Sequence, residues 1–184
     1  MAPADGRQSG EVLIRLLAPG DDRSRFASGD IELDRFFRLY AGQNQFRHHI
    51  GSTYIALAGD MIAGFMTVSP GEMSAGTASA VLKKKLPAYP IPILRIARLA
   101  VDTHFQGRGI GKLLLRAMFE LALELRDRTG CAGVVADAKP GAVGFCRGLG
   151  FMLLEVVRGA LGARPKPLPM LLPIKLIDMA KSGM

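Results

Sequence analysis

The chain has 184 residues, of which 49% are hydrophobic and 22% are charged, a balance typical of one globular domain with a sizeable core. No apolar run reaches the roughly 18 residues that a membrane helix needs, and the first residues lack the apolar stretch of a secretory signal. We therefore expect a single cytoplasmic domain over residues 1–184, with residues 1–10 flexible.

The net charge indicates which partners are favoured, and the cysteines and histidines indicate the redox state and the absence of a metal site. A net charge of +8 favours an anionic partner such as a phosphorylated cofactor, nucleic acid or an acidic protein. A basic surface that only keeps the protein soluble is the alternative. Cys131 and Cys146 are expected to be reduced thiols. With three histidines and no CxxC pair, the sequence predicts no metal site.

The hydrophobic pattern predicts strands that alternate with helices. Strand character is found in residues 12–17, 52–58, 61–69, 93–101, 132–138, 151–157 and 170–177. Helical spacing or helix end signals are found in residues 28–45, 109–128 and 140–150. Asp30 is the predicted N-cap of the first helix. Gly59 and Asp60 form the turn of a predicted hairpin.

The order of these elements indicates the fold class. Strand 93–101, a glycine loop, the amphipathic helix 109–128 and strand 132–138 form a βαβ unit. Together with the hairpin, this unit predicts an α/β (α+β) domain whose mixed, mostly antiparallel sheet is flanked by helices. The proline-rich segment 159–184 ends in 170–177, which we expect to be an edge strand because such strands tolerate proline.

Two groups of basic residues interrupt the apolar pattern. Lys83, Lys84 and Lys85 follow a stretch of small residues and predict an exposed turn or helix end. Arg95 and Arg98 are the exceptions in strand 93–101, which is otherwise apolar on both faces.

The loop QGRGIGK, residues 106–112, is suited to binding phosphate. Its alternating glycines allow the backbone to approach a ligand closely, and the following helix points unpaired N–H groups at the same place. Arg108 and Lys112 add positive charge. A Walker loop is excluded, because Gln106 and Leu113 replace the required glycine and hydroxyl. The dinucleotide fingerprint also fails, because Lys112 stands where its third glycine belongs.

The remaining pattern, Gln106-x-x-Gly109-x-Gly111 between a strand and a long helix, resembles the pyrophosphate loop of the GNAT family of N-acetyltransferases. The resemblance implies acetyl-CoA as co-substrate and central strands that splay apart where it binds. It places the pantetheine and acetyl group on Leu99, Ala100 and Val101, whose N–H groups include the oxyanion donor at Val101. It places the rest of the cofactor on Gln106, Gly107, Arg108, Gly109, Ile110, Gly111, Lys112, Asp137, Ala142 and Phe145.

Several segments between residues 26 and 175 resemble, in the same order, the TacT-like toxin acetyltransferases of toxin–antitoxin pairs. They include STYIAL, GFMTVSPGEM and RIARLAVDTHFQGRGIGKLLL. This resemblance implies acetylation of the amino group of aminoacyl-tRNA and inhibition by a ribbon-helix-helix antitoxin. It also suggests a homodimer, for which residues 170–179 are the candidate interface. The candidate tRNA surface consists of Arg35, Arg38, Arg47, Lys83, Lys84 and Lys85.

Cys146 departs from the toxin pattern, which has a tyrosine in this place that is taken to protonate the leaving thiolate. Three roles are open for Cys146. It donates the proton as a thiol, it is inert core packing, or it accepts the acetyl group covalently.

Three functions follow from these alternatives. The first is a toxin that acetylates aminoacyl-tRNA, and the second is a GNAT enzyme acting on a small amine or a protein N-terminus. The third is a CoA-binding module that has lost catalysis at position 146. A broad basic acceptor cleft favours the first function, and a narrow acidic one favours the second.

Overall fold

The computed structural model describes residues 11–154 and 167–183. Its strands are β1 (Val12–Leu16), β2 (Ser52–Ala58), β3 (Met61–Met73), β4 (Ile91–Val101), β5 (Gly133–Ala138), β6 (Met152–Leu153) and β7 (Leu168–Pro173). Its helical segments are α1 (Ile31–Arg35), η1 (Phe36–Tyr40), η2 (Gln43–His48), α2 (Ala75–Leu82), α3 (Ile110–Arg128), η3 (Pro140–Ala142), α4 (Val143–Gly148) and α5 (Ile174–Ser182). Residues 1–10, predicted to be flexible, lie outside the described residues.

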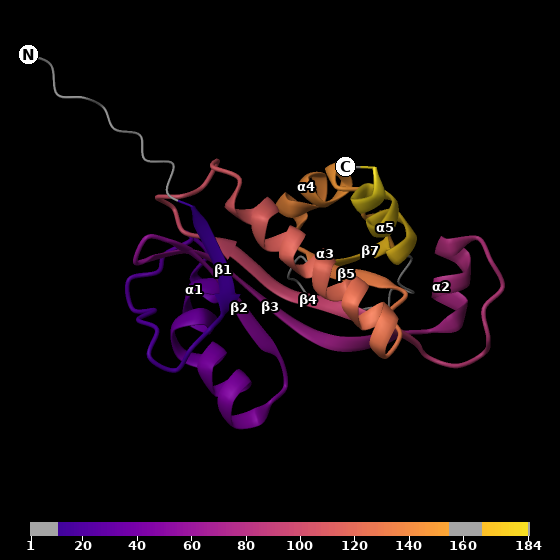
Figure 1. The fold of residues 1–184 in the computed structure, drawn as a ribbon, viewed down its shortest axis with the longest axis horizontal. Helices are drawn as coiled ribbons and strands as arrows, with labels where there is room; N and C mark the ends of the chain where they lie inside the picture. Colours follow the sequence, from indigo (N-terminus) through magenta and orange to yellow (C-terminus); the bar gives the residue numbers. More distant parts are fainter. Residues whose placement is uncertain (1–10, 155–166, 184) are drawn as a thin grey trace, which may run out of the picture.

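The strands form one sheet in the order β1-β2-β3-β4-β5-β7-β6 (Figure 1). All neighbouring strands are antiparallel except β4 and β5, which are parallel and joined by α3. This arrangement confirms the predicted mixed sheet and its βαβ unit. The predicted hairpin turn is also confirmed, with Gly59 in the left-handed conformation (φ 62°) that glycine adopts without strain.

The first predicted helix begins where the sequence indicates and then changes character. The Asp30 carboxylate caps α1 by accepting hydrogen bonds from the backbone N–H groups of Glu32 and Leu33, at 3.0 and 3.1 Å. From Phe36 onward the chain continues as the π-helical segments η1 and η2. Phe36 and Phe37 are both buried against the sheet, which anchors this arm to the core.

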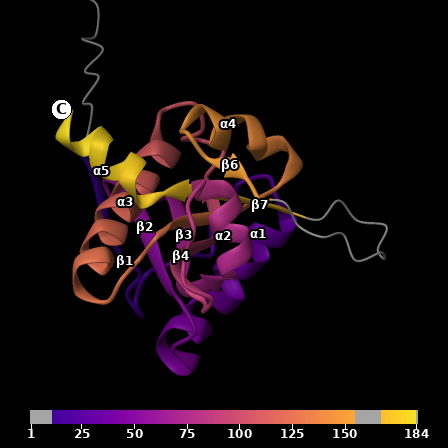
Figure 2. The ribbon, with the colours of Figure 1, turned by 90° about the vertical axis from the view of Figure 1, so that its right-hand side faces the viewer.

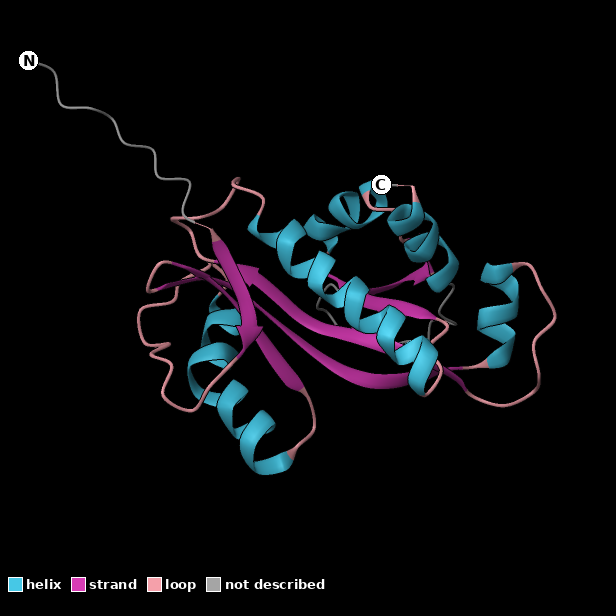
Figure 3. Cartoon of the chain, in the orientation of Figure 1, coloured by secondary structure: helices cyan, strands magenta, loops and turns pink. Residues whose placement is uncertain are grey.

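Buried residues form one hydrophobic core on the face of the sheet that α3 and α5 cover, and two on the other face, one under α1 and a smaller one under α2 (Figures 2 and 3). The core on the α1 face is aromatic: Phe37 stacks on Phe65 of β3 with ring centres 4.2 Å apart, and Phe26 packs edge-on against both. On the α3 face, the helix buries Leu114, Leu115 and Met118, whereas Leu113 is exposed.

The C-terminal part of the chain corrects one prediction. Residues 170–177 were expected to form an edge strand, but β7 lies between β5 and β6 and pairs with both at Met170 and Leu171. The strand ends at Pro173, and α5 begins at the next residue. Pro173 has no N–H to continue the ladder, and Ile174 and Ile177 have the spacing of a helix face.

Two further predictions near the C-terminus, strand 151–157 and a homodimer interface at residues 170–179, can be compared with the structure only in part. Predicted strand 151–157 is described only through Leu154, of which Met152 and Leu153 form β6. In the segment expected to form a homodimer interface, Met170, Leu171 and Leu172 are core residues, whereas Leu176 and Met179 are exposed. The homodimer therefore stays a prediction, and α5 is the part of the segment that is free to make it.

Lys83 ends a short helix. A helix end was one of the two structures predicted for this basic segment, the other being an exposed turn. Helix α2 is inserted between β3 and β4, and Lys83 closes it in the left-handed conformation (φ 49°). Among the described residues, none of the helices combines the length and the apolar character that crossing a membrane requires.

Replacing Phe65 tests the aromatic core. Phe65 is fully buried and contacts three other phenylalanine rings, so Phe65→Ala should lower the free energy of unfolding by about 3–5 kcal/mol. Urea denaturation followed by circular dichroism measures this change. The exposed Tyr89 is the control, and Tyr89→Ala should change stability by no more than about 0.5 kcal/mol. A loss below about 1 kcal/mol for Phe65→Ala would contradict the assignment.

Candidate active site

The sheet opens between β4 and β5. The two strands pair only from Leu94 to Ile96 on β4, although β4 continues to Val101. At the same point β4 carries a bulge: Thr67 pairs with Arg98 and its neighbour Val68 pairs with Ile96, so Ala97 is an extra residue. The predicted splay of the central strands is therefore present, and the bulge marks where it starts.

The opening leaves backbone groups of β4 free to bind a ligand. The N–H of Asp102 donates to the carbonyl of Ala63 on β3, at 2.9 Å. Because successive residues of a strand point their N–H groups to opposite sides, the N–H of Val101 points away from β3 and toward the opening. The predicted oxyanion donor therefore has the required direction.

A cavity of about 200 Å³, here called the inner cavity, lies within the opening. Five predicted site residues line it, from β4, β5, η3 and α4: Leu99, Asp137, Ala142, Phe145 and Cys146. Most of the remaining lining is apolar. Ala100 is different, because its side chain belongs to the aromatic core on the α1 face. Its predicted contact with a ligand can therefore come only from its backbone.

The glycine loop lies at the N-terminus of α3, as predicted. Gly107 and Gly109 have φ values of 74° and 83°, and a side chain at either position would meet no atom within 4 Å. The loop therefore presents open space in front of unpaired helix N–H groups, which is where a phosphate group fits. Gly111 lies beside two residues that line the inner cavity, with Leu99 and Phe145 within 3.9 Å of where its Cβ would stand.

Four predicted members of the loop differ in what their side chains contact. Arg108 and Lys112 are exposed and available to an anion. Ile110 is buried in the core on the α3 face, so only its backbone faces the loop. Gln106 donates from Nε2 to the carbonyls of Ser28 and Val101, at 2.9 and 3.0 Å. Its side chain thus braces the loop.

Asp102 is a second residue that holds the start of the loop in place, and the sequence analysis did not identify it. Its buried carboxylate accepts hydrogen bonds from the backbone N–H groups of Ala27 and His104, at 3.0 and 2.9 Å, and lies 2.8 Å from His104 Nδ1. Burial acts to raise the pKa of Asp102, but these hydrogen bonds outweigh it and the pKa is lowered. The only sequence signal for this role is that Asp102 is a single acidic residue directly after an apolar strand. An ordinary surface residue gives the same pattern.

Asp137 and Arg95 form an ion pair at the edge of the opening. The guanidinium donates to both carboxylate oxygens, at 2.8 and 2.9 Å, and this hydrogen bonding raises the pKa of Arg95. The Asp137 carboxylate was predicted to contact the cofactor, and in the structure it is engaged by Arg95. Asp137 thus fixes a neighbouring cation in place.

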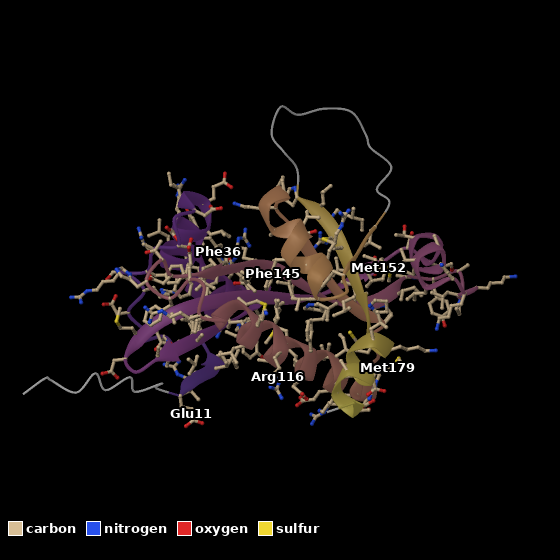
Figure 4. All side chains as sticks on the ribbon, turned by 90° about the horizontal axis from the view of Figure 1, so that it is seen from above. Glu11, Phe36, Arg116, Phe145, Met152 and Met179 are labelled. Carbon is tan, nitrogen blue, oxygen red and sulfur yellow. The ribbon has the colours of Figure 1, made fainter. Side chains whose placement is uncertain are left out.

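A larger cavity of about 810 Å³ lies on the α1 face and is here called the cationic cavity. Its lining includes four cations, namely Arg35, Arg95, Arg98 and Lys139. Lys139 contacts Asp30 and lies 3.9 Å from Glu32. Figure 4 labels Phe36 of η1, which lines the cationic cavity, and Phe145 of α4, which lines the inner cavity.

The inner and cationic cavities meet at the opening. Both are lined by Leu33, Ala97, Arg98, Asp137 and Lys139. A molecule in one cavity can therefore reach a molecule in the other between the parted strands. This is the geometry that a transfer between two substrates requires.

Cys146 faces the inner cavity and is almost fully buried. Burial raises the pKa of its thiol, so the thiol stays protonated at neutral pH. No histidine lines the cavity and no hydrogen bond activates the sulfur among the described residues. This environment disfavours the covalent role, which needs a thiolate, and leaves the proton-donor and packing roles open.

The predicted tRNA surface divides into two groups. Arg35 and Arg38 lie on the arm that begins with α1, and Lys83–Lys85 follow α2 at the opposite end of the sheet (Figure 1). Arg38 is partly structural, because its Nε donates to the carbonyl of Phe26 at 2.9 Å. Arg47 lies farther along the arm in η2. The cationic cavity adds Arg95, Arg98 and Lys139, which the sequence did not single out as site residues.

Comparison with known proteins decides the family. The model described as "Acetyltransferase (GNAT) domain" matches residues 49–153, more than half of the chain. The chain belongs to the GNAT acetyltransferase family. The matched GNAT residues contain β4, the glycine loop, α3 and α4, the elements that surround the opening. The family and fold predicted from the sequence are therefore confirmed.

Similar proteins include toxins. A tRNA-acetylating toxin from Mycobacterium tuberculosis is 29% identical over 132 residues, which cover 71% of this chain and 77% of that protein. A crystal structure of a bacterial toxin has a TM-score of 0.82 and 25% identity, with 95% of this chain and 97% of that chain covered.

The toxin AtaT has the same fold in two complexes. Its complex with acetyl-methionyl-tRNAfMet has a TM-score of 0.78 and 23% identity, with 93% of this chain and 99% of that chain covered. A tyrosine-to-phenylalanine mutant of AtaT, bound to acetyl-CoA and the C-terminus of the antitoxin AtaR, has a TM-score of 0.72 and 21% identity. In that comparison 93% of this chain and 98% of that chain are covered.

The glycine loop can be tested by direct binding. Gly109→Ala should weaken acetyl-CoA binding about tenfold or more, because its Cβ occupies the open space and strains a left-handed residue. Isothermal titration calorimetry measures the affinity. Gly76 in α2 also has open space around it, so Gly76→Ala is the matched control and should bind like the wild type. Equal affinities for all three proteins would rule out the loop as the phosphate site.

The environment of Cys146 predicts slow chemistry at the thiol. At neutral pH, alkylation by iodoacetamide should be much slower than for an exposed cysteine, and it should accelerate as the pH rises above the ordinary thiol range. Acetyl-CoA should protect Cys146 further by filling the inner cavity. Peptide mass spectrometry gives both rates. An acetyl group found on Cys146 after incubation with acetyl-CoA would show that the covalent role is correct after all.

Proposed function

We propose that this protein transfers the acetyl group of acetyl-CoA to the α-amino group of an aminoacyl-tRNA. The observation that carries the proposal is the shared wall of the inner and cationic cavities. An apolar cavity beside the glycine loop suits the pantetheine and acetyl group, and a cation-lined cavity suits a polyanionic acceptor. The two meet where β4 and β5 part.

Different residues of the chain bind the co-substrate, stabilise the developing charge and exclude water. The glycine loop and α3 hold the phosphates of the co-substrate, with Arg108 and Lys112 as charged partners. The Val101 N–H donates to the carbonyl oxygen of the thioester and stabilises the negative charge that develops there. Phe145 and Leu99 exclude water from the thioester. The Cys146 thiol lines the inner cavity and is the candidate proton donor to the leaving CoA sulfur.

The acceptor side is supported by charge and by the relatives. The cationic cavity has four cations, and the basic arm with Arg35 and Arg47 adjoins it. The relative from Mycobacterium tuberculosis acetylates tRNA, and AtaT was solved with an acetylated methionyl-tRNA. This combination favours the tRNA acceptor over a small amine, because a small amine needs no extended cationic surface.

Partners and location follow from the same proposal. Toxins of this kind are controlled by antitoxins, as the complex of AtaT with AtaR illustrates, and we propose a ribbon-helix-helix antitoxin for this chain. Aminoacyl-tRNA is used in translation, which places the reaction in the cytoplasm. A homodimer through α5 is compatible with the exposed Leu176 and Met179.

Acetylation of charged tRNA tests the proposed function directly. The purified protein, acetyl-CoA and a total pool of charged tRNA should give N-acetylaminoacyl-adenosine after nuclease digestion, detected by mass spectrometry. The rate should fall steeply between about 50 and 200 mM salt, because phosphate contacts release counterions. Deacylated tRNA is the negative control.

Two outcomes would replace the proposal. Acetylation of a small amine or peptide N-terminus without any tRNA product would make the protein a GNAT enzyme of another substrate class. Tight binding of acetyl-CoA without transfer to any amine would make it a binding module. In that case Cys146→Tyr, which restores the tyrosine of the resembling toxins, should restore transfer.

A further inference from the structure

We propose that Tyr40 is a stacking platform for the base of the nucleotide that carries the amino acid, and that Arg35 beside it binds the adjoining phosphate. The proposal rests on the proposed acetylation of aminoacyl-tRNA. It adds to that function the part of the RNA that the arm beginning with α1 recognises, namely the unpaired 3′ end. It starts from an exposed aromatic ring in the wall of the cationic cavity.

Tyr40 differs from the other aromatic residue that lines the cationic cavity in the described part of the chain. Phe36 is only 6% exposed, and the guanidinium carbon of Arg98 lies 3.8 Å from its ring centre, so one face of that ring is covered. The Tyr40 residue is 40% exposed. An aromatic ring combines a large apolar area with a negative face, and a flat ligand that stacks on it covers this area favourably. Tyr40 therefore offers the cavity an aromatic surface that the protein itself leaves uncovered.

Contacts within the arm orient the Tyr40 side chain. Nη2 of Arg35 donates a hydrogen bond to Oη of Tyr40 at 3.4 Å, and the guanidinium carbon of Arg35 lies 5.9 Å from the ring centre. The two residues are five positions apart at the start of the π-helical segment η1, where this spacing corresponds to one turn. A ring that is oriented before binding loses little conformational entropy when a ligand stacks on it.

The position of Tyr40 along the arm follows from the residues that precede it. Leu33 lines both the inner and the cationic cavity, whereas Phe36 and Tyr40 line the cationic cavity alone. Phe36 and Tyr40 are four positions apart and lie on one face of η1, about 5–6 Å from each other at their Cβ atoms. From Leu33 to Tyr40 the cavity wall thus leads away from the opening between β4 and β5.

The end of an aminoacyl-tRNA carries its chemical groups in a matching order. The amine is followed by the ester, the ribose, and then the base and phosphate of the same nucleotide. When the amine lies at the opening, the base lies farther along the wall, on the side of Tyr40. Unpaired bases of RNA are recognised by stacking on aromatic rings and arginine planes, and such stacking is tolerant of sequence because every base has a π-face.

Position distinguishes Tyr40 from the other exposed aromatic residue of the arm. Phe46 is exposed to a similar extent, but it belongs to η2 and lines neither the inner nor the cationic cavity. Tyr40 also has an arginine beside it, so a base and its phosphate find an aromatic surface and a positive charge together. A small amine or a peptide has neither group and gains nothing from this pair.

Binding of uncharged RNA tests the role of Tyr40 without relying on catalysis. One RNA is an acceptor-stem duplex with its unpaired 3′ extension, and the other is the same duplex with a blunt end. Fluorescence anisotropy at one fixed salt concentration measures both affinities. The wild type should bind the extended RNA more tightly. Tyr40→Ala should lose about tenfold in affinity for the extended RNA and nothing for the blunt one, because stacking of one base contributes about 5- to 150-fold.

Two further variants identify the ring as the cause. Tyr40→Phe keeps the ring and removes the hydroxyl, so its affinity for the extended RNA should stay within about twofold of the wild type. Tyr89→Ala is the matched control, because Tyr89 is exposed and lines neither cavity. It should bind both RNAs like the wild type. In the transfer assay, kcat/KM for methionyl-tRNA should fall about tenfold in Tyr40→Ala and recover in Tyr40→Phe.

The outcomes separate this proposal from the proposed function. If the wild type transfers no acetyl group to methionyl-tRNA, the proposed function fails, and the binding experiment still decides the role of Tyr40. Equal affinity of the wild type for the two RNAs, or an equal loss on both in a folded Tyr40→Ala, refutes base stacking. The same loss in Tyr40→Phe as in Tyr40→Ala assigns the effect to the hydroxyl and also overturns the proposal. Should Tyr40→Ala not fold, Tyr40→Gln removes the ring in its place.

Discussion

The loss of pairing between β4 and β5 is the constraint on which the rest of the structure depends. A strand that parts from its neighbour exposes a row of N–H and C=O groups, and such groups are costly when they face apolar surroundings without a partner. Here the row that β5 leaves unpaired begins at the bulge of Ala97 and ends at Val101, whose carbonyl accepts a hydrogen bond from Gln106. The fold thereby keeps a gap in the middle of its sheet, and a co-substrate with amide groups can complete the ladder.

The gap persists because β4 is held firmly from other directions. Its opposite side pairs with β3 along its whole length, and α3 packs below it. At its C-terminal end, the Asp102 carboxylate and the Gln106 amide tie the strand to the segment that leads into α1. Rigid positioning of this kind is what a transfer reaction needs, because the reacting atoms must be held within a fraction of an ångström.

Features encoded in a short stretch of sequence were predicted well. The spacing of Gly107, Gly109 and Gly111, the Asp30 cap and the βαβ unit all depend on neighbours in the chain, so their residue types are sufficient evidence. The Phe36–Arg98 contact and the binding of Asp137 by Arg95 join distant segments. No local pattern encodes them. The place of β7 was missed for a related reason: strand order depends on long-range pairing, and prolines at its ends resemble those of an edge strand.

The Gln106 side chain joins the glycine loop to the segment that precedes α1. Its single amide group holds the carbonyl of Val101 and the carbonyl of Ser28, and Ser28 also donates to Asp34 at the start of the arm that walls the cationic cavity. The loop that faces the co-substrate and the wall that faces the acceptor are therefore connected through one side chain. Thermodynamic linkage then requires reciprocity: whatever factor acetyl-CoA applies to the affinity for the acceptor, the acceptor applies to the affinity for acetyl-CoA.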